Sequence, residues 1–111
     1  MNKASRMSDR DHQILKIFAA KARQHFPAAR IWAFGSRARG DATWESDLDV
    51  CLVLDQCDRH IDHLIDQIAW EVGFEHELII MPICFSSEEF EHGPMSASTL
   101  VMNIVREGIA A

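Results

Sequence analysis

Two aspartates that flank a single leucine, Asp47 and Asp49, are the residues of this sequence best suited to chemistry. They open a run of β-branched and apolar residues, 47–54, that is typical of a buried strand. Residues two apart in a strand point to the same face, so both carboxylates would face one volume. Two like charges placed together raise each other's pKa unless a cation neutralises them, and carboxylate oxygens suit Mg²⁺ or Mn²⁺. The pair therefore predicts a divalent-cation site.

A second segment suited to chemistry precedes the aspartates in the sequence. The apolar stretch 30–34 predicts a strand that leads directly into Gly35 and Ser36. Backbone N–H groups beside a glycine are unobstructed, and a short helix starting near Arg37 would turn its positive end to the same place. The Ser36 hydroxyl can donate to a phosphate oxygen, while Arg37 and Arg39 can offset the charge of a triphosphate. No Gly-Lys-Ser/Thr follows, so this is not a Walker A loop. The segment is expected to cradle phosphates.

Either half of this pattern alone is usually structural, a turn or a solvated pair of carboxylates. Together, at the spacing Gly-Ser-x10-Asp-x-Asp, they resemble the signature of the polymerase-β-like nucleotidyltransferase superfamily. The fuller string GSRARGDATWESDLDV, residues 35–50, resembles the minimal, MNT-type branch of that superfamily. The resemblance implies an α/β (α+β) fold with a small mixed sheet flanked by helices.

The resemblance also implies roles for these residues. The Gly-Ser turn would hold the β- and γ-phosphates of a nucleoside triphosphate, and the aspartate pair would ligate two divalent ions, Mg²⁺ above all and Mn²⁺ as the alternative. Members of the superfamily usually add a third carboxylate, commonly Asp, on a later strand. Here the third predicted strand, 77–81, begins with Glu77, so Glu77 is the expected third metal ligand or base. Glu75 would share its face and is the alternative.

Two functions stay open under this resemblance. The first is a Mg²⁺-dependent enzyme that transfers AMP from ATP to a protein hydroxyl. Small members of the MNT branch are typically antitoxins encoded with HEPN-domain RNase toxins, and some of them transfer AMP to a toxin tyrosine. The second is an idle domain that neutralises its toxin by binding alone, which the Glu77 departure favours. Transfer to a small molecule such as an aminoglycoside is disfavoured, because such enzymes usually carry an added domain that holds the acceptor.

Hydrophobic periodicity predicts the elements that position these groups. A first helix begins at a capping box formed by Ser8 and Asp11 and reaches about residue 26. After the strands 30–34 and 47–54 a second helix is expected at 58–72, ended by Gly73. The third strand is expected to close at Pro82, with an extension through residues 83–85 past a kink as the alternative. A short capped helix near 86–90 and a last helix from 96 to about 107 complete the order. This order predicts one minimal domain over residues 1–111.

Composition and charge narrow the class of protein. The 111 residues carry a formal net charge of −6, and residues 55–111 hold two Lys or Arg against eleven Asp or Glu. Nucleic acid is therefore an unlikely partner, because binding it normally needs a broad basic face. Three cysteines without C-x-x-C spacing indicate neither a disulfide framework nor a zinc site, and there is no apolar stretch long enough to span a membrane. A cytoplasmic protein that acts in a homo-oligomer or a hetero-complex is expected.

Two further features admit more than one interpretation. Trp44, in the polar loop between the two halves of the motif, would either anchor the loop or line the nucleotide or partner surface. His60 and His63 have a spacing that could hold a metal on a helix. Because nothing nearby completes a ligand set, a solvated helix face is the favoured interpretation.

Overall fold

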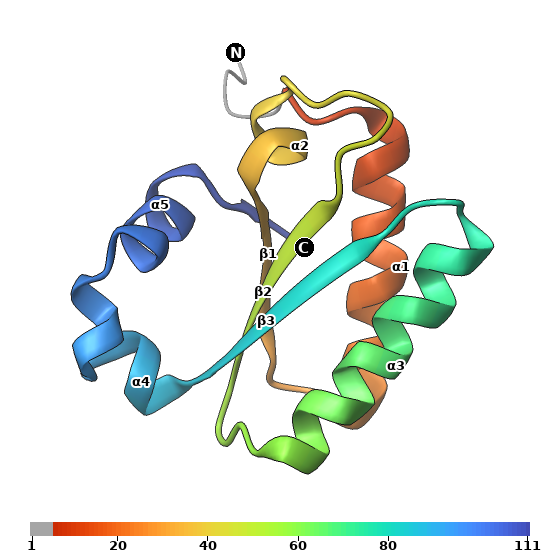
Figure 1. Ribbon diagram of the computed structural model, residues 1–111. Helices are drawn as coiled ribbons and strands as arrows, with labels where there is room; N and C mark the ends of the chain where they lie inside the picture. Colours follow the sequence, from red (N-terminus) through yellow and green to blue (C-terminus); the bar gives the residue numbers. More distant parts are fainter. Residues whose placement is uncertain (1–5) are drawn as a thin grey trace.

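The computed structural model describes residues 6–111. The first five residues lie outside the described part, and with them the start of the predicted domain. The described chain forms a four-stranded mixed sheet covered by helices on both faces (Figure 1), which confirms the predicted fold class. No helix of this described part is long and apolar enough to cross a membrane. In chain order the elements are α1 (Asp9–His25), β1 (Arg30–Phe34), α2 (Gly35–Arg39), β2 (Leu48–Leu54), α3 (Arg59–Glu75), β3 (Ile80–Ser86), α4 (Ser87–Glu91), the 3₁₀ helix η1 (Pro94–Ala97), α5 (Thr99–Glu107) and β4 (Ile109–Ala110).

The sheet has the strand order β3-β2-β1-β4. Strands β1 and β2 are antiparallel and joined through the segment that holds the motif, whereas β2 and β3 are parallel and joined by the crossover helix α3. The motif strand β2 is thus central, as its apolar sequence predicts. β3 is an edge strand.

Side-chain alternation along β2 separates two cores. Leu48, Val50 and Leu52 are buried among residues of α1 and α3, whereas Cys51 and Val53 are buried with residues of β3, α4 and α5. Figure 1 shows the same division, with α1 and α3 on one side of the sheet and α4 and α5 on the other. Asp49 and Cys51 are two residues apart in β2, so their side chains point to the same face of the sheet, the one covered by α4 and α5. Burial raises the pKa of the Cys51 thiol to about 12, so Cys51 is a core residue rather than a nucleophile.

Helix α3 extends past the predicted end at Gly73 and finishes at Glu75. Gly73 lies inside the helix for another reason: a Cβ there would come within 2.3 Å of the Leu78 carbonyl oxygen. The Leu78 N–H in turn donates to the Gly73 carbonyl at 2.9 Å. The glycine therefore permits the chain to fold back tightly onto the helix, and it is not a helix-terminating residue.

The third strand begins at Ile80 and not at Glu77, so the predicted start is wrong, whereas the alternative that residues 83–85 extend the strand is confirmed. Glu77 lies in the turn before the strand with a φ of 56°, a left-handed conformation uncommon for a residue with a side chain. Pro82 does not close the strand but sits within it. An edge strand tolerates the missing N–H, because one side of it has no partner strand.

The structure joins Cys57 to Cys84 in a disulfide, with the two Cα atoms 6.4 Å apart. The expectation that no disulfide forms is therefore wrong. The cysteine count and spacing gave no signal, because the pairing depends on the crossover: Cys57 follows the end of β2, and Cys84 lies on β3 beside Leu52 of β2. The parallel connection brings the two together.

Candidate active site

Asp47 and Asp49 lie together at the start of β2, as predicted. Asp47 immediately precedes the strand and Asp49 is its second residue, and both side chains are half-buried. Burial raises the pKa of the Asp49 carboxyl, the negative charge of Asp47 raises it further, and the positive charge of Arg39 opposes both. The two carboxylates therefore repel each other on one face of the sheet, which a bound cation would relieve.

Gly35 faces this carboxylate directly across the β1–β2 pairing. Phe34, the last residue of β1, is the register partner of Asp49. Gly35 follows with a φ of 79°, and a Cβ built on it would come within 2.4 Å of Asp49 Oδ2. Only glycine fits, both by conformation and by space. The predicted phosphate cradle and the predicted metal ligands are consequently adjacent parts of one site.

Ser36 continues the cradle in the first turn of α2. Its carbonyl accepts hydrogen bonds from the N–H groups of Gly40 (3.0 Å) and Asp41 (3.1 Å), which close the short helix. Gly40 ends the helix with a φ of 83°. No hydrogen bond to the Ser36 hydroxyl occurs within residues 6–111. The hydroxyl is free to meet a ligand.

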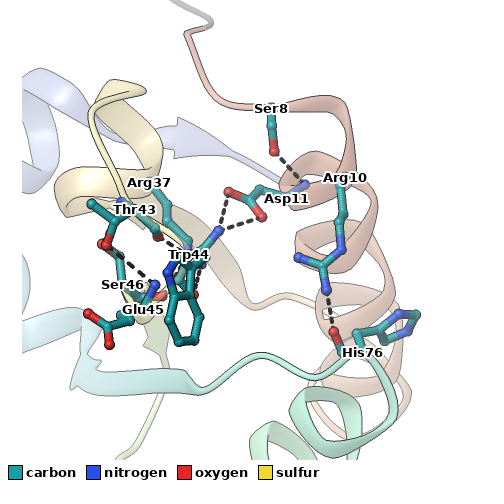
Figure 2. A network of polar contacts seen from close by, with 9 residues as sticks. All are labelled: Ser8, Arg10, Asp11, Arg37, Thr43, Trp44, Glu45, Ser46 and His76. Carbon is teal, nitrogen blue, oxygen red and sulfur yellow. Dashed lines mark hydrogen bonds and ion pairs between the residues drawn. The ribbon is translucent and has the colours of Figure 1, made fainter.

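Arg37 has a different role from the predicted one. Its side chain is 8% exposed, and its Nη1 forms an ion pair with Asp11 of α1, donating to Oδ1 at 3.1 Å and to Oδ2 at 3.0 Å. The remaining N–H groups donate to loop carbonyls, those of Ser46 at 2.7 Å and of Thr43 and Trp44 at 3.3 Å (Figure 2). No donor is left for a phosphate, because every guanidinium nitrogen is engaged. Arg37 instead holds the loop that leads into β2 against α1.

The capping box predicted for α1 is only half formed for the same reason. The Ser8 hydroxyl accepts from the Asp11 N–H at 3.1 Å, as a helix cap does. The Asp11 carboxylate turns to Arg37 (Figure 2). An acidic residue in the first turn of a helix is ordinary, so nothing local in the sequence identifies this pair.

Arg39 is the arginine that remains at the site. It is exposed and contacts Asp41 and Glu107 only at 3.4 Å each. Hydrogen bonding to Asp41 is the main cause that raises the pKa of Arg39, with a smaller contribution from Glu107. Exposed ion pairs of this length hold a side chain weakly. Its charge also acts on Asp49, so Arg39 lies where it could turn to a phosphate.

The third predicted carboxylate is not found on the strand face beside the aspartates. Asp49 pairs in register with Met81 of β3, and the residues two before and two after Met81 are Ile79, which immediately precedes the strand, and Ile83. Three apolar residues therefore occupy the positions from which a third carboxylate would face Asp49. Glu77 is exposed in the turn before β3, and it lines an open groove with Asp47 and Glu75. Glu77 and Asp47 thus border one space from different sides.

The polar loop carries Trp44 outward. The backbone N–H of Thr43 donates to Ser46 Oγ at 3.0 Å, and Arg37 binds the loop carbonyls, so the loop is anchored without the indole. Trp44 is 86% exposed, so the loop-anchor interpretation is wrong. His60 and His63 are both exposed on α3, in agreement with a solvated helix face.

Comparison with known proteins agrees with this geometry. A family model of the nucleotidyltransferase domain matches residues 14–109. A crystal structure of a toxin–antitoxin with AMP-PNP superimposes with a TM-score of 0.57 at 16% identity, over 86% of this chain and 70% of that one. A proposed nucleotidyltransferase from Sulfolobus solfataricus superimposes with a TM-score of 0.54 at 18% identity, over 99% and 89% of the chains. No curated protein sequence matches.

Proposed function

The chain belongs to the nucleotidyltransferase domain family, and from that premise we propose that it transfers AMP from ATP to a hydroxyl group of a partner protein. The observation that supports the proposal best is the close approach of Gly35 to Asp49. A Cβ built on Gly35 would lie only 2.4 Å from Asp49 Oδ2. A phosphate held at the Gly35–Ser36 turn would lie against the carboxylates. That is the arrangement a nucleotidyl transfer requires.

The donor set fits a divalent cation. Asp47 and Asp49 are half-buried carboxylates at the start of β2, and burial, then the charge of Asp47, raise the pKa of Asp49. Oxygen-only ligands of this kind suit Mg²⁺, which usually completes its shell with water and substrate phosphates. Asp47 and Asp49 would hold the ion. When bound, Mg²⁺ would supply neutralisation of the charge that develops on the phosphates.

Side chains of this protein would bind the terminal phosphates and accept the proton of the acceptor hydroxyl. The Ser36 hydroxyl would donate to a terminal phosphate oxygen, and Arg39 would turn from Asp41 to the same phosphates. The acceptor oxygen forms a bond to the α-phosphorus as the bond from that phosphorus to the bridging oxygen breaks, and pyrophosphate leaves. The hydroxyl proton passes to a carboxylate, for which Asp49 is the candidate on the sheet face and Glu77 the one in the groove wall.

We further propose that the acceptor is a tyrosine of a cognate HEPN-domain toxin and that the chain acts as its antitoxin. Two observations support this setting. One structural neighbour is a toxin–antitoxin crystallised with AMP-PNP, an ATP analogue. The family match and the strands and helices occupy nearly the whole of this chain, so an acceptor-holding domain is not among the residues at hand.

Thermal unfolding tests nucleotide binding at this site. Mg²⁺ with ATP should raise the Tm of the wild-type protein by mass action on the folded state. The double variant Asp47→Asn, Asp49→Asn should lose that response and still fold, because it removes a repulsive pair. Asp55→Asn, an exposed aspartate at the opposite end of β2, is the matched control and should respond like wild type. A full response in the double variant would refute the metal assignment.

A second function is favoured by one specific observation, the apolar residues Ile79, Met81 and Ile83 where a third carboxylate would face Asp49. A domain without that carboxylate could neutralise its toxin by binding alone. The two functions differ in what Asp49→Asn does in cells. A modifying antitoxin should fail to protect, whereas a binding antitoxin should protect as well as wild type, provided that each variant co-purifies with the partner.

A further inference from the structure

The outer edge of the sheet carries an open groove of about 1000 Å³, and apart from the carboxylates in its lining its residues have no role in the proposed reaction. It lies along β3, between the loop of Trp44 and the outer side of α3. Five large apolar side chains in it are exposed, which we call the edge-groove residues: Trp44 86%, Trp70 67%, Phe74 73%, Ile79 61% and Met81 49%. Monomeric proteins rarely leave so many large apolar groups exposed in one place.

Two of these residues form an ordered aromatic surface. Trp70 and Phe74 are four apart on α3, outside the stripe by which that helix packs on the sheet, and their rings stack at 5.1 Å with an interplanar angle of 9°. An amphipathic helix in water would place polar residues there. Rigid aromatic side chains of this kind are the residue types that dominate binding energy at protein interfaces.

The rim of the groove is acidic. Among the described residues that line it there are no Lys or Arg and five carboxylates, those of Glu45, Asp47, Asp66, Glu75 and Glu77. An apolar floor inside an anionic rim matches a segment with apolar side chains flanked by Lys or Arg. Arginine would gain twice, from the carboxylates and from the faces of the tryptophan rings.

Two other occupants fit less well. In a symmetric dimer each groove would meet the same groove, so two acidic rims would face each other. An added β-strand would pair with β3, but Pro82 within that strand lacks the N–H that such pairing uses. A helical or irregular segment of a different protein avoids both problems.

We infer that the edge groove is the docking site for a cationic, amphipathic segment of a partner protein. The inference deepens the proposed function, because Asp47 belongs both to the groove wall and to the aspartate pair. A partner anchored on Trp70 and Phe74 would have its next residues beside the carboxylates. The groove would thus serve as an acceptor-binding surface.

The test uses a tryptophan-free amphipathic helical peptide of Leu and Lys as the probe, with a Leu and Glu peptide of equal hydrophobicity as its control. Trp44 and Trp70 report binding through their fluorescence. We expect the Lys peptide to shift the emission saturably, with an affinity that falls as salt rises, and the Glu peptide to have no effect. Phe74→Ser with Ile79→Ser, which keeps all tryptophans, should weaken binding roughly tenfold or more. Met102→Ser with Val105→Ser, exposed apolar residues of α5, should leave it unchanged.

Three results would overturn the inference. Equal binding of the Lys and Glu peptides would remove the charge argument, and unchanged binding in the Phe74→Ser, Ile79→Ser protein would remove the location. Self-association of the wild type that this variant abolishes would assign the groove to a second copy. The Mg²⁺ and ATP thermal response should survive in the groove variant, so a failed docking site and a failed catalytic site give separate readouts.

Discussion

Strands β2 and β3 lie side by side and parallel, yet they present opposite chemistry at the same level of the sheet. Asp49 on β2 is the register partner of Met81 on β3, and Asp47 precedes it as Ile79 precedes Met81. The segment from β1 through α2 to β2 therefore holds Gly35, Ser36, Arg39 and the two aspartates, which are the groups proposed to bind the nucleotide and the metal. The β3 side offers apolar contact. Under the proposed function, the domain would supply the nucleotide-binding half of the site and a partner protein would supply the acceptor half.

The largest effect is expected where the carboxylates of β2 are removed. Asp47→Asn with Asp49→Asn should lower AMP transfer roughly a thousandfold or more, because it removes both carboxylates that would hold the divalent cation. Transfer is measured as incorporation of labelled AMP into the co-purified partner. Asp55→Asn should transfer at the wild-type rate. Residual transfer within tenfold of wild type in the double variant would place the chemistry elsewhere.

A second variant disrupts the loop that leads into β2. Arg37→Ala leaves Asp11 buried without its ion pair and frees three loop carbonyls, so we expect the free energy of unfolding to fall by about 3–5 kcal/mol. Denaturant unfolding measures it. Replacing both partners, Arg37→Met with Asp11→Leu, should recover part of the loss. Arg39→Ala should change stability by less than about 1 kcal/mol, because its ion pairs are exposed. Equal losses in the two arginine variants would contradict the separate roles given to them.

Ser36→Ala probes the phosphate end with a smaller change. The hydroxyl makes no contact that stabilises the described fold, so the Tm should not move. Loss of one hydrogen bond to a charged phosphate should reduce transfer about ten- to a hundredfold. Steady-state transfer at saturating partner measures it. Wild-type transfer by Ser36→Ala would mean that the Gly35–Ser36 turn does not hold the triphosphate.

Met81→Asp would make β3 resemble β2. A carboxylate there would face Asp49, and we expect transfer to rise about tenfold, equivalent to roughly 1.4 kcal/mol of the barrier. Met81→Asn, which has the same shape without the charge, should not raise it. Glu77→Gln is the companion variant. If it abolishes transfer while Met81→Asp adds nothing, Glu77 already completes the site from the groove wall, as the sequence analysis predicted.

The smallest effect concerns stability and pH in the metal-free protein. Because the folded state raises the pKa of Asp49 above its ordinary 3.8, ionisation of Asp49 opposes folding, and this penalty grows as pH rises through the folded-state pKa. Asp49→Asn should therefore raise the Tm at neutral pH in the presence of a chelator. The gain should vanish at a pH below 3.8, where the carboxyl is protonated in both states. A gain that is the same at both pH values would rule out this electrostatic cause.

Much of the candidate nucleotide site could be predicted because its residues follow local sequence patterns. A glycine after an apolar strand and two aspartates at alternate positions of another strand need only backbone periodicity to be placed. The structure brings Gly35 and Asp49 into direct apposition through the antiparallel pairing of β1 with β2. The sequence indicates Gly35 and Asp49 as separate candidate residues, but it does not show how closely they approach each other.

The failures share a physical cause, which is long-range pairing. The sequence predicts Arg37 as a phosphate ligand, but in the structure its guanidinium is bound by Asp11 of a different helix. Alternation places Glu77 on a strand only if the strand begins there, and the left-handed turn at Glu77 breaks the alternation. The Cys57–Cys84 disulfide depends on a parallel crossover.

Two differently labelled ATP molecules distinguish transfer of AMP by this chain from other reactions of ATP. The protein co-purified with its partner is incubated with Mg²⁺ and ATP labelled at either the α- or the γ-phosphorus. We expect the label on the α-phosphorus to become covalently attached to the partner and the label on the γ-phosphorus to be released in pyrophosphate. Asp49→Asn should abolish both. Attachment of γ-label, or no attachment of either label by an intact complex, would contradict this expectation.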